Sequence, residues 1–255
     1  MTEVCAVVPV YNHEAAVGIT TGNLRRHGLP VLLVDDGSGP DCAAELRRLC
    51  AADPAVRLLR LPENRGKGAA VMAGLRAAAE QGFTHALQID ADGQHDASDV
   101  PRFVAAALAE PHALICGRPI FDVSIPRSRL YLRYLTHAMV WLNTLSFDIP
   151  DSMCGLRVYP LSVVLPVVTA DPPGSRMDFD IEVLVRLHWN GVALRWMPVR
   201  VSYPLDGVSH FRLVRDNGLI TMMHLRLFFG MLRRSPGLIA RRLRTVSSAT
   251  PGVTT

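Results

Sequence analysis

Short apolar runs alternate with stretches of helical periodicity through the first half of the chain. The runs have the length of buried strands, and the apolar positions between them recur at the spacing of amphipathic helices. This alternation predicts an α/β fold of Rossmann-like type, with a mostly parallel sheet and helices on both faces. The predicted strands are Val4–Val10, Val31–Val34, Val56–Leu61, Ala86–Ile89 and Ala113–Cys116, and the predicted helices are Ala15–His27, Asp41–Ala52, Gly68–Gln81 and Val100–Ala109.

The rhythm changes after residue 120. A long helical pattern leads into the segment DIPDSMCGLRVY, which is turn-like and then strand-like. Signals for helix starts and stops predict a last, basic helical stretch with a break at Ser235-Pro236. The expected helices are Arg129–Leu145, Asp178–Trp189 and Val214–Arg244, and a further strand is expected over Val192–Tyr203. Residues 247–255 are small and polar, so we expect a flexible tail.

Composition narrows the class of protein. The chain is 49% hydrophobic and 20% charged with a net charge of +4, and it lacks the aromatic-studded basic groove of a nucleic-acid binder. Its cysteines are scattered, odd in number and without a CxxC pair, which argues against a zinc site or disulfide framework and favours a reducing cytoplasm. We recognise no signal peptide and no apolar run long enough to span a membrane.

Polar segments follow the predicted strands, at the edge where parallel sheets bind their ligands. Strand ends carry the sequences PVYNHE, VDDGS, PENRGKG and IDADGQHD. The first turn lacks the glycines of a dinucleotide fingerprint, and the chain has no GxxxxGK[ST] phosphate loop. These observations disfavour a dinucleotide-dependent oxidoreductase and a P-loop enzyme.

Asp90-Ala91-Asp92 is the sharpest of these features. Two carboxylates spaced i and i+2 at a strand end can turn toward one hard cation, Mg²⁺ or Mn²⁺, whose remaining positions would hold substrate phosphates. Gln94, His95 and Asp96 follow closely and could complete the ligand shell. Such a cation neutralises a leaving diphosphate, as in release of a sugar from a nucleotide. The alternative is a solvated acidic turn.

Two other strand ends carry candidate binding groups. Two adjacent carboxylates, Asp35 and Asp36, are costly to place together at a strand end, and a base or ribose would use them as acceptors; a turn with a helix cap is the alternative. Lys67, or the backbone amides around it, would meet phosphate at the start of the next helix. That segment also fits an ordinary helix entrance.

Together, PVYNHE, VDDGS, NRGKGAAVMAG and DADGQHD resemble the successive motifs of family 2 glycosyltransferases with the GT-A fold, nearest to the dolichyl-phosphate mannose/glucose synthase-like branch. The resemblance covers about residues 4–205 and implies inverting transfer from a UDP- or GDP-sugar with Mg²⁺ or Mn²⁺ bound. By this resemblance Asp90, Asp92 and Gln94 surround the metal and diphosphate. The nucleotide-sugar side comprises Pro9, Tyr11, Asn12, Glu14, Asp35, Asp36, Lys67, Asp90, Ala91 and Asp92.

The second half adds matches. Cys116-Gly117-Arg118 resembles a family segment that implies Arg118 near phosphate. The segment from Asp151 through Gly155 to Arg157 resembles the acceptor side, although Arg157 also reads as a surface cation. The spacing of Asp180 and Arg186 resembles the family's "ED…R" segment, which implies Asp180 as catalytic base, with Glu182 second. Acids in a first helical turn also suit the helix dipole, and a lipid phosphate acceptor needs no base.

One segment departs from the polyprenyl-phosphate branch. Where that branch has "R-G-x-S-K", this chain reads Asp206-Gly207-Val208-Ser209-His210, which weakens the case for a polyprenyl-phosphate acceptor. We expect Ser209 on the acceptor side, and His210 and Arg212 as a flap over the diphosphate. A narrower resemblance, to glycosyltransferases of bacterial aryl-polyene lipid pathways, implies a lipid-like hydroxyl acceptor.

Arginines interleaved with apolar residues mark the C-terminal segment 214–246. This pattern favours a helix in the interface of an anionic membrane, so we expect a peripheral protein on the inner face of the cell membrane. A helix packed on the domain or a homodimer contact is the alternative. We expect a GT-A domain over 1–213, divided into a nucleotide-sugar half (1–118) and an acceptor half (119–213). Rival functions are a sugar nucleotidyltransferase and a silent nucleotide-sugar-binding protein.

Overall fold

The computed structural model describes residues 3–120, 127–200 and 213–248; for 127–132, 213–214 and 244–248 it describes the backbone alone. Within these ranges a seven-stranded sheet has the order β3-β2-β1-β4-β6-β5-β7. The strands are β1 (Val4–Val10), β2 (Val31–Asp35), β3 (Val56–Arg60), β4 (His85–Gln88), β5 (Leu114–Ile120), β6 (Arg157–Pro160) and β7 (Leu194–Arg200).

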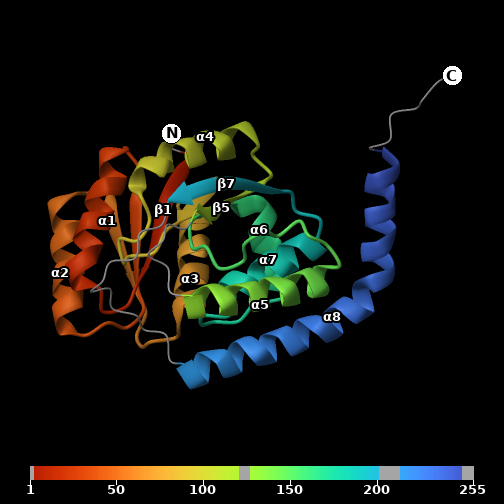
Figure 1. Ribbon diagram of the computed structural model, residues 1–255. Helices are drawn as coiled ribbons and strands as arrows, with labels where there is room; N and C mark the ends of the chain where they lie inside the picture. The colour runs from red at the N-terminus through yellow and green to blue at the C-terminus, as the bar shows by residue number, and fades with distance from the viewer. Residues whose placement is uncertain (1–2, 121–126, 201–212, 249–255) are drawn as a thin grey trace.

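Helices cover both faces of this sheet (Figure 1). They are α1 (Glu14–Arg26), α2 (Pro40–Ala52), α3 (Lys67–Glu80), the 3-10 turn η1 (Ala97–Asp99), α4 (Val100–Ala109), α5 (Arg127–Thr144), α6 (Leu161–Ala170), α7 (Phe179–Trp189) and α8 (Leu213–Ser248). The predicted α/β class with a mostly parallel sheet is confirmed.

Alternation along the strands builds two hydrophobic cores. In β1, Cys5 and Val7 point to the cluster that includes α3, α6 and α7, whereas Ala6 and Val8 point to the cluster that includes α1, α2 and α4. Successive strand side chains face opposite sides, so a fully apolar strand fits only a sheet covered on both faces. The unbroken apolar run of β1 is therefore explained by its central place in the sheet.

One strand runs against the others. β6 is antiparallel to both β4 and β5, and its first residue, Arg157, lies opposite Gln88 and Cys116. All other paired strands are parallel. Since the parallel strands end at one edge of the sheet, the reversed direction of β6 brings Arg157 to that same edge. The sequence predicted a strand here but not its direction.

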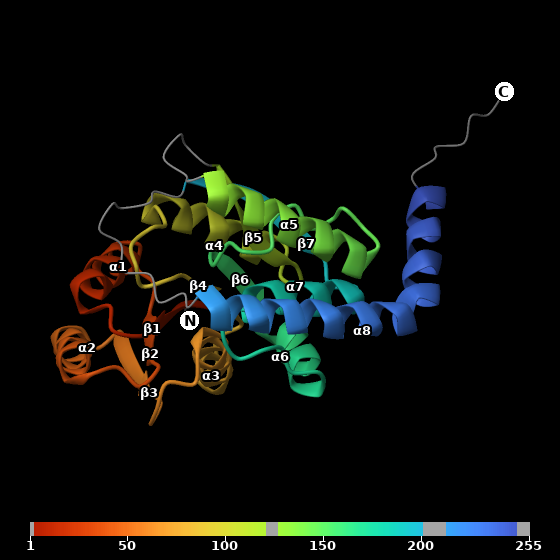
Figure 2. The ribbon, with the colours of Figure 1, turned by 60° about the horizontal axis from the view of Figure 1, so that its bottom comes forward.

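Helix α8 packs on the domain along one side and is exposed along the other. Met223, Leu227 and Met231 lie in the cluster that also contains α7, so the expected boundary at residue 213 does not separate α8 from the domain core. The expected break at Ser235-Pro236 is wrong, because α8 continues through Pro236 as one helix. It bends sharply along its length (Figures 1 and 2), as a proline inside a helix causes.

Candidate active site

A lysine joins two carboxylates at the edge where the parallel strands end. Lys67 Nζ lies 2.8 Å from Asp90 Oδ1 and 2.9 Å from Asp90 Oδ2, and it lies 2.8 Å from Asp180 Oδ2. Lys67 begins α3, Asp90 follows β4, and Asp180 is in the first turn of α7. Three segments that the sequence singled out separately therefore form one cluster.

Two glycines allow α3 and α7 to begin so close together. A Cβ on Gly68 would lie 2.5 Å from Cβ of Phe179, and a Cβ on Gly66 would lie 2.5 Å from the carbonyl oxygen of Ser175. Gly66 also has a φ of +101°, which side chains rarely tolerate. The NRGKG segment thus permits the close approach that brings Lys67 to Asp180.

The carboxylate of Asp180 is held from two further sides. Gln88 Nε2 donates to Asp180 Oδ1 at 3.0 Å, and Arg157 Nη1 lies 3.8 Å from the same oxygen. Tyr159 donates its hydroxyl to Gln88 Oε1 at 2.9 Å, which fixes the orientation of the amide. Burial alone would raise the pKa of Asp180, but the charges of Lys67 and Arg157 outweigh it and hold that pKa below its ordinary value. Asp180 is thereby kept ionised.

Gln88 and Tyr159 were not predicted as site residues. Both belong to strands, β4 and β6, next to residues that were singled out, but neither residue type marked them as part of a site. The strand pairing that places them together becomes visible only when β6 is seen to be antiparallel. Arg157, in contrast, was singled out from its motif, and the structure shows it to be a buried cation, 1% exposed, not a surface one.

Asp92 lies two residues after Asp90 in the same loop. Its Oδ1 accepts a hydrogen bond from the backbone N–H of Gln94 at 3.0 Å. Burial, and then the charge of Asp90, raise the pKa of Asp92. Nδ1 of nearby His95 is buried without a hydrogen-bond partner. A half-buried carboxylate beside a second carboxylate and an unsatisfied imidazole nitrogen fits a cation site.

This site is not complete by itself. In the described part of the chain, no group of three or more His, Cys, Asp or Glu side chains is arranged to hold a metal ion. Proteins nevertheless often bind Mg²⁺ through only one or two carboxylates, and substrate phosphates supply further ligands. The oxygen donor set therefore fits Mg²⁺ or Mn²⁺ bound together with a diphosphate.

The predicted acceptor-side segment wraps around Asp90. A Cβ on Gly155 would lie 2.5 Å from Asp90 Oδ2, so only glycine allows this contact. Asp151 Oδ1 accepts the backbone N–H groups of Met153 and Cys154 at 3.0 and 2.9 Å, and Arg133 Nε donates to its Oδ2 at 2.7 Å. Asp151 thus shapes the loop that carries Gly155.

The predicted nucleotide-binding carboxylates are buried and bonded within the protein. Asp36 accepts the backbone N–H groups of Arg65 at 2.7 Å and Gly66 at 2.8 Å. Asp35 accepts the N–H of Ser38 at 2.8 Å and pairs with Arg60 at 2.9 Å. Both hold the loops at the ends of β2 and β3. Their contact with a base or ribose stays a prediction.

The other predicted residues are spread around this edge. Asn12 has a φ of 51° and accepts the N–H of Gly39 at 2.8 Å. Pro9 and Ala91 are buried, Tyr11 is half-buried, and Glu14 is exposed in the first turn of α1. Arg118 is exposed on β5, opposite Pro198 of β7. Ser209, His210 and Arg212 lie outside the described residues.

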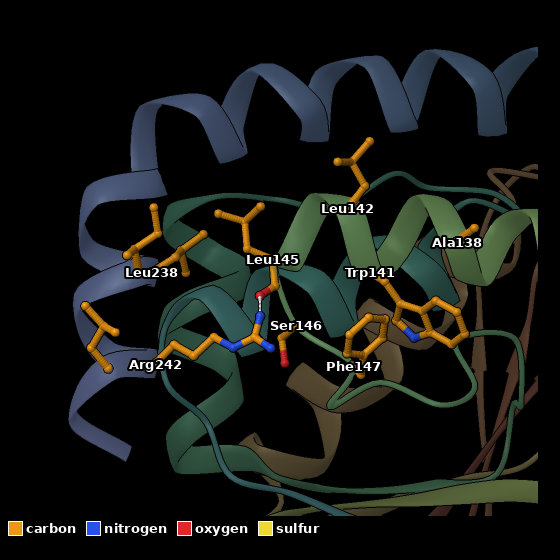
Figure 3. Close-up of a pocket in the computed structure, with 10 residues that line it drawn as sticks. Ala138, Trp141, Leu142, Leu145, Ser146, Phe147, Leu238 and Arg242 are labelled. Atoms are coloured by element: carbon orange, nitrogen blue, oxygen red, sulfur yellow. Dashed lines mark hydrogen bonds between the residues drawn. The ribbon is translucent and has the colours of Figure 1, made fainter. Parts of the chain in front are cut away.

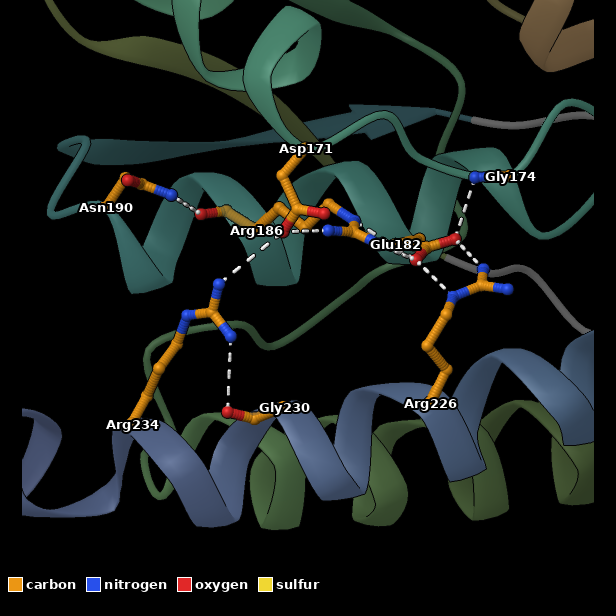
Figure 4. A network of polar contacts seen from close by, with 8 residues as sticks. All are labelled: Asp171, Gly174, Glu182, Arg186, Asn190, Arg226, Gly230 and Arg234. Carbon is orange, nitrogen blue, oxygen red and sulfur yellow. Dashed lines mark hydrogen bonds and ion pairs between the residues drawn. The ribbon is translucent and has the colours of Figure 1, made fainter.

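Glu182 lies in a separate network (Figure 4). Its side chain is fully buried and pairs with Arg186 at 2.6 Å and with Arg226 of α8 at 2.5 Å, and it accepts the N–H of Gly174 at 2.7 Å. Arg234 of α8 joins through Asp171, at 3.5 Å. The structure therefore does not bring Glu182, our second choice for the base, to Asp90, and its role is to fasten α8 to α7.

An apolar pocket of about 670 Å³ lies between α5 and the part of α8 beyond Pro236 (Figure 3). The guanidinium of Arg242 crosses it and donates to the carbonyl oxygen of Leu145 at 2.7 Å. The pocket is near the C-terminal end of α7, where Trp189 donates to the carbonyl oxygen of Asn143, and so at the opposite end of that helix from Asp180. Its lining residues include Trp141, Leu142, Phe147, Leu238, Ile239 and Leu243.

Comparison with known proteins identifies the family of the chain. Glycosyl transferase family 2 matches residues 5–165. The chain is 22% identical to UDP-N-acetylglucosamine–dolichyl-phosphate N-acetylglucosaminyltransferase of Methanococcus voltae, over 91% of this chain and 96% of that one. It is 26% identical to polyprenol monophosphomannose synthase of Mycolicibacterium smegmatis, over 80% of this chain and 78% of that one.

Solved structures show the same fold. Glucosyl-3-phosphoglycerate synthase of Mycobacterium tuberculosis, in complex with Mn²⁺ and UDP-glucose, matches 91% of this chain and 79% of its own, with a TM-score of 0.63 and 16% identity. The expected GT-A arrangement is confirmed. The chain belongs to glycosyl transferase family 2 and is a glycosyltransferase.

Proposed function

We propose that this enzyme transfers a sugar from a UDP- or GDP-sugar to a polyprenyl phosphate, with inversion at the anomeric carbon and with Mg²⁺ or Mn²⁺ bound. The observation that carries the proposal is the cluster in which Lys67 joins Asp90 to Asp180. The ammonium group of Lys67 thus contacts both Asp90, a proposed ligand of the cation, and Asp180, an ionised carboxylate on the proposed acceptor side.

The donor side is built from the cation site. Asp90 and Asp92, with Gln94 beside them, would hold the ion, which neutralises the charge that develops on the leaving diphosphate. The Mn²⁺ and UDP-glucose bound to the structurally similar synthase support this choice. Tyr11 and Asn12 lie at the neighbouring strand end, where we propose that the base and ribose bind.

The acceptor side is built from α7 and β6. Asp180 faces Arg157 across 3.8 Å. Dolichyl phosphate appears in the name of the Methanococcus voltae relative and polyprenol in that of the Mycolicibacterium smegmatis relative, which supports a polyprenyl phosphate here. A phosphate oxygen attacks without losing a proton, so this acceptor needs no general base. Asp180 would then serve to position Lys67 and Arg157.

A lipid hydroxyl is the second candidate acceptor, because Asp180 is held ionised and could accept the hydroxyl proton. Asp180→Asn separates the two chemistries. With a hydroxyl acceptor the variant must lose general-base catalysis, a factor of about 10² to 10⁴ in kcat. With a phosphate acceptor the loss should be smaller and appear partly in KM.

A transfer assay tests the function itself. Purified enzyme, Mn²⁺, a panel of UDP- and GDP-sugars and a polyprenyl phosphate should give a sugar-linked lipid with at least one donor. Asp92→Asn should abolish the metal-dependent rate. Glu80→Gln is the matched control, because it makes the same carboxylate-to-amide change at an exposed position at the opposite end of α3 from Lys67. Binding of UDP or GDP without transfer from any donor would instead show a silent binding protein.

We also propose that the outer side of α8 lies on an anionic membrane. No helix within the described residues is long and apolar enough to cross a bilayer. The outer side nevertheless exposes Leu225, Phe229 and Leu232 by 48, 67 and 50%, with the exposed Arg233 beside them. An apolar stripe flanked by arginine fits the lipid interface, and the pocket in Figure 3 offers further apolar surface near Ile239.

Flotation with liposomes tests this surface. Phe229→Glu should abolish binding to vesicles that contain anionic lipid, because a carboxylate replaces the most exposed ring of the stripe. Ala44→Glu adds the same charge at an exposed position of α2, away from α8 (Figure 1), and should leave binding intact. Equal flotation of both variants would exclude the outer side of α8 as the contact. Truncation is a poorer test, since α8 also packs in the core.

A further inference from the structure

We propose that Lys67 makes cation binding conditional on the sugar-nucleotide: its ammonium holds Asp90 until a donor diphosphate draws it away. This inference rests on the proposed function, because it concerns the same cation site. It adds an order of events, in which the ion and the nucleotide bind together and the ion alone binds weakly.

The contact of Lys67 with Asp90 is the first observation. The ammonium lies 2.8 and 2.9 Å from the two oxygens of Asp90, so both oxygens that would ligate an ion already face a positive charge. The two side chains are 17 and 25% exposed, which reduces screening by water. A divalent ion that approaches Asp90 must therefore displace the ammonium or bear its repulsion.

The charge around this pair is the second observation. Asp90 and Asp180 are balanced by Lys67 and Arg157, so that part of the site is already neutral before any ion arrives. Among the described residues, Asp92 is the further carboxylate at the cation site, and one of its oxygens already accepts the N–H of Gln94. A divalent ion alone would leave uncompensated positive charge, whereas an ion paired with a diphosphate would not.

Lys67 can also release Asp90 without losing every partner. Its ammonium has three donors, and its 2.8 Å contact with Asp180 can persist when Asp90 is released. The freed donors would then face a diphosphate at the N-terminal end of α3, which itself favours anions. One side chain can thus exchange a carboxylate for a phosphate without leaving the site.

Binding of Mn²⁺ followed by electron paramagnetic resonance, with UDP or GDP as the diphosphate, tests the proposal. Wild-type protein should bind Mn²⁺ weakly alone and more tightly with one of the nucleotides, after correction for Mn²⁺ bound by free nucleotide. Lys67→Met should bind Mn²⁺ alone about ten- to a hundredfold more tightly than wild type. Substitutions of groups that contact metal ligands typically change metal affinity by about this factor. The nucleotide should then add little.

Two further variants make the result specific. Arg76→Met removes an exposed cation from the same helix and should leave Mn²⁺ affinity unchanged. Lys67→Arg keeps the positive charge between Asp90 and Asp180 and should resemble wild type even if Lys67→Met folds poorly. If wild type binds Mn²⁺ and Lys67→Met binds it no more tightly, the proposed role of Lys67 is wrong, whereas the metal-dependent function stands. Failure of both proteins to bind Mn²⁺ with either nucleotide would overturn that role together with the metal-dependent function.

Discussion

Replacing Gly155 by alanine tests the site through a single methyl group. The new Cβ would lie 2.5 Å from Oδ2, 2.9 Å from Cγ and 3.0 Å from Oδ1 of Asp90. Carbon and oxygen atoms rarely approach below about 3 Å, so the carboxylate must retreat by about half an ångström or more. Misplacement by about 1 Å typically costs a factor of about 10² in rate. We therefore expect kcat/KM to fall about ten- to a hundredfold.

The assay compares transfer, Mn²⁺ affinity and thermal unfolding for this variant. Extra atoms in a packed site cost about 1–3 kcal/mol, and we expect the low end because the side chain of Asp90 is 25% exposed and can move. Gly22→Ala is the control, since its Cβ would have no neighbour within 4 Å. That change in α1 should leave activity intact and stabilise the helix by up to about 1 kcal/mol.

Retention of wild-type kcat/KM and Mn²⁺ affinity by Gly155→Ala would refute the reasoning. It would mean that the position of the Asp90 carboxylate does not limit the reaction, and Asp90 would lose its place as a cation ligand. A variant that loses activity only because it unfolds is recognised by its thermal transition, and Gly155→Ser then repeats the steric test with a polar group.

Other consequences concern stability. Burial lowers the pKa of His224 to about 4, so as pH falls the unfolded chain takes up a proton first; stability is complete above about pH 6.5 and falls toward pH 4, by about 2 kcal/mol at pH 5. Urea unfolding across this range should show the slope, and His224→Gln should flatten it. Glu182→Gln should cost about 3–5 kcal/mol because it removes the fully buried carboxylate that pairs with both Arg186 and Arg226. Arg226→Met should cost only about 1 kcal/mol, since that arginine is half exposed; equal losses in thermal unfolding would contradict this ranking.

Much of the donor side was predictable because parallel strands end at one edge. Once β1, β2, β3 and β4 were recognised as parallel, the polar residues after them had to meet there. The pair of Lys67 and Asp180 was not predictable from the pattern alone. It depends on the close approach of α3 and α7 that Gly68 allows, and no periodicity encodes a contact between segments so far apart.

Two other features were not predicted correctly from the sequence, for local reasons. α6 was not predicted, because its sequence LSVVLPVVTA is rich in β-branched residues and contains Pro166, and packing against the sheet overrides both. Glu182 looked like a second base because it lies two residues from Asp180. In a helix that spacing sends side chains to different faces, and only the position of α8 shows that this one meets Arg226.

The ion pairs of Glu182 also have a mechanical consequence. Glu182 grips Arg226 of α8 two residues after Asp180, and Arg234 repeats the attachment through Asp171 (Figure 4). Ion pairs therefore tie α8 to α7 and its surroundings at two points. If the outer side of α8 rests on lipid, these ion pairs set the distance between the headgroups and Asp180, and we expect the enzyme to favour acceptors whose reactive atom projects from the bilayer by about that distance.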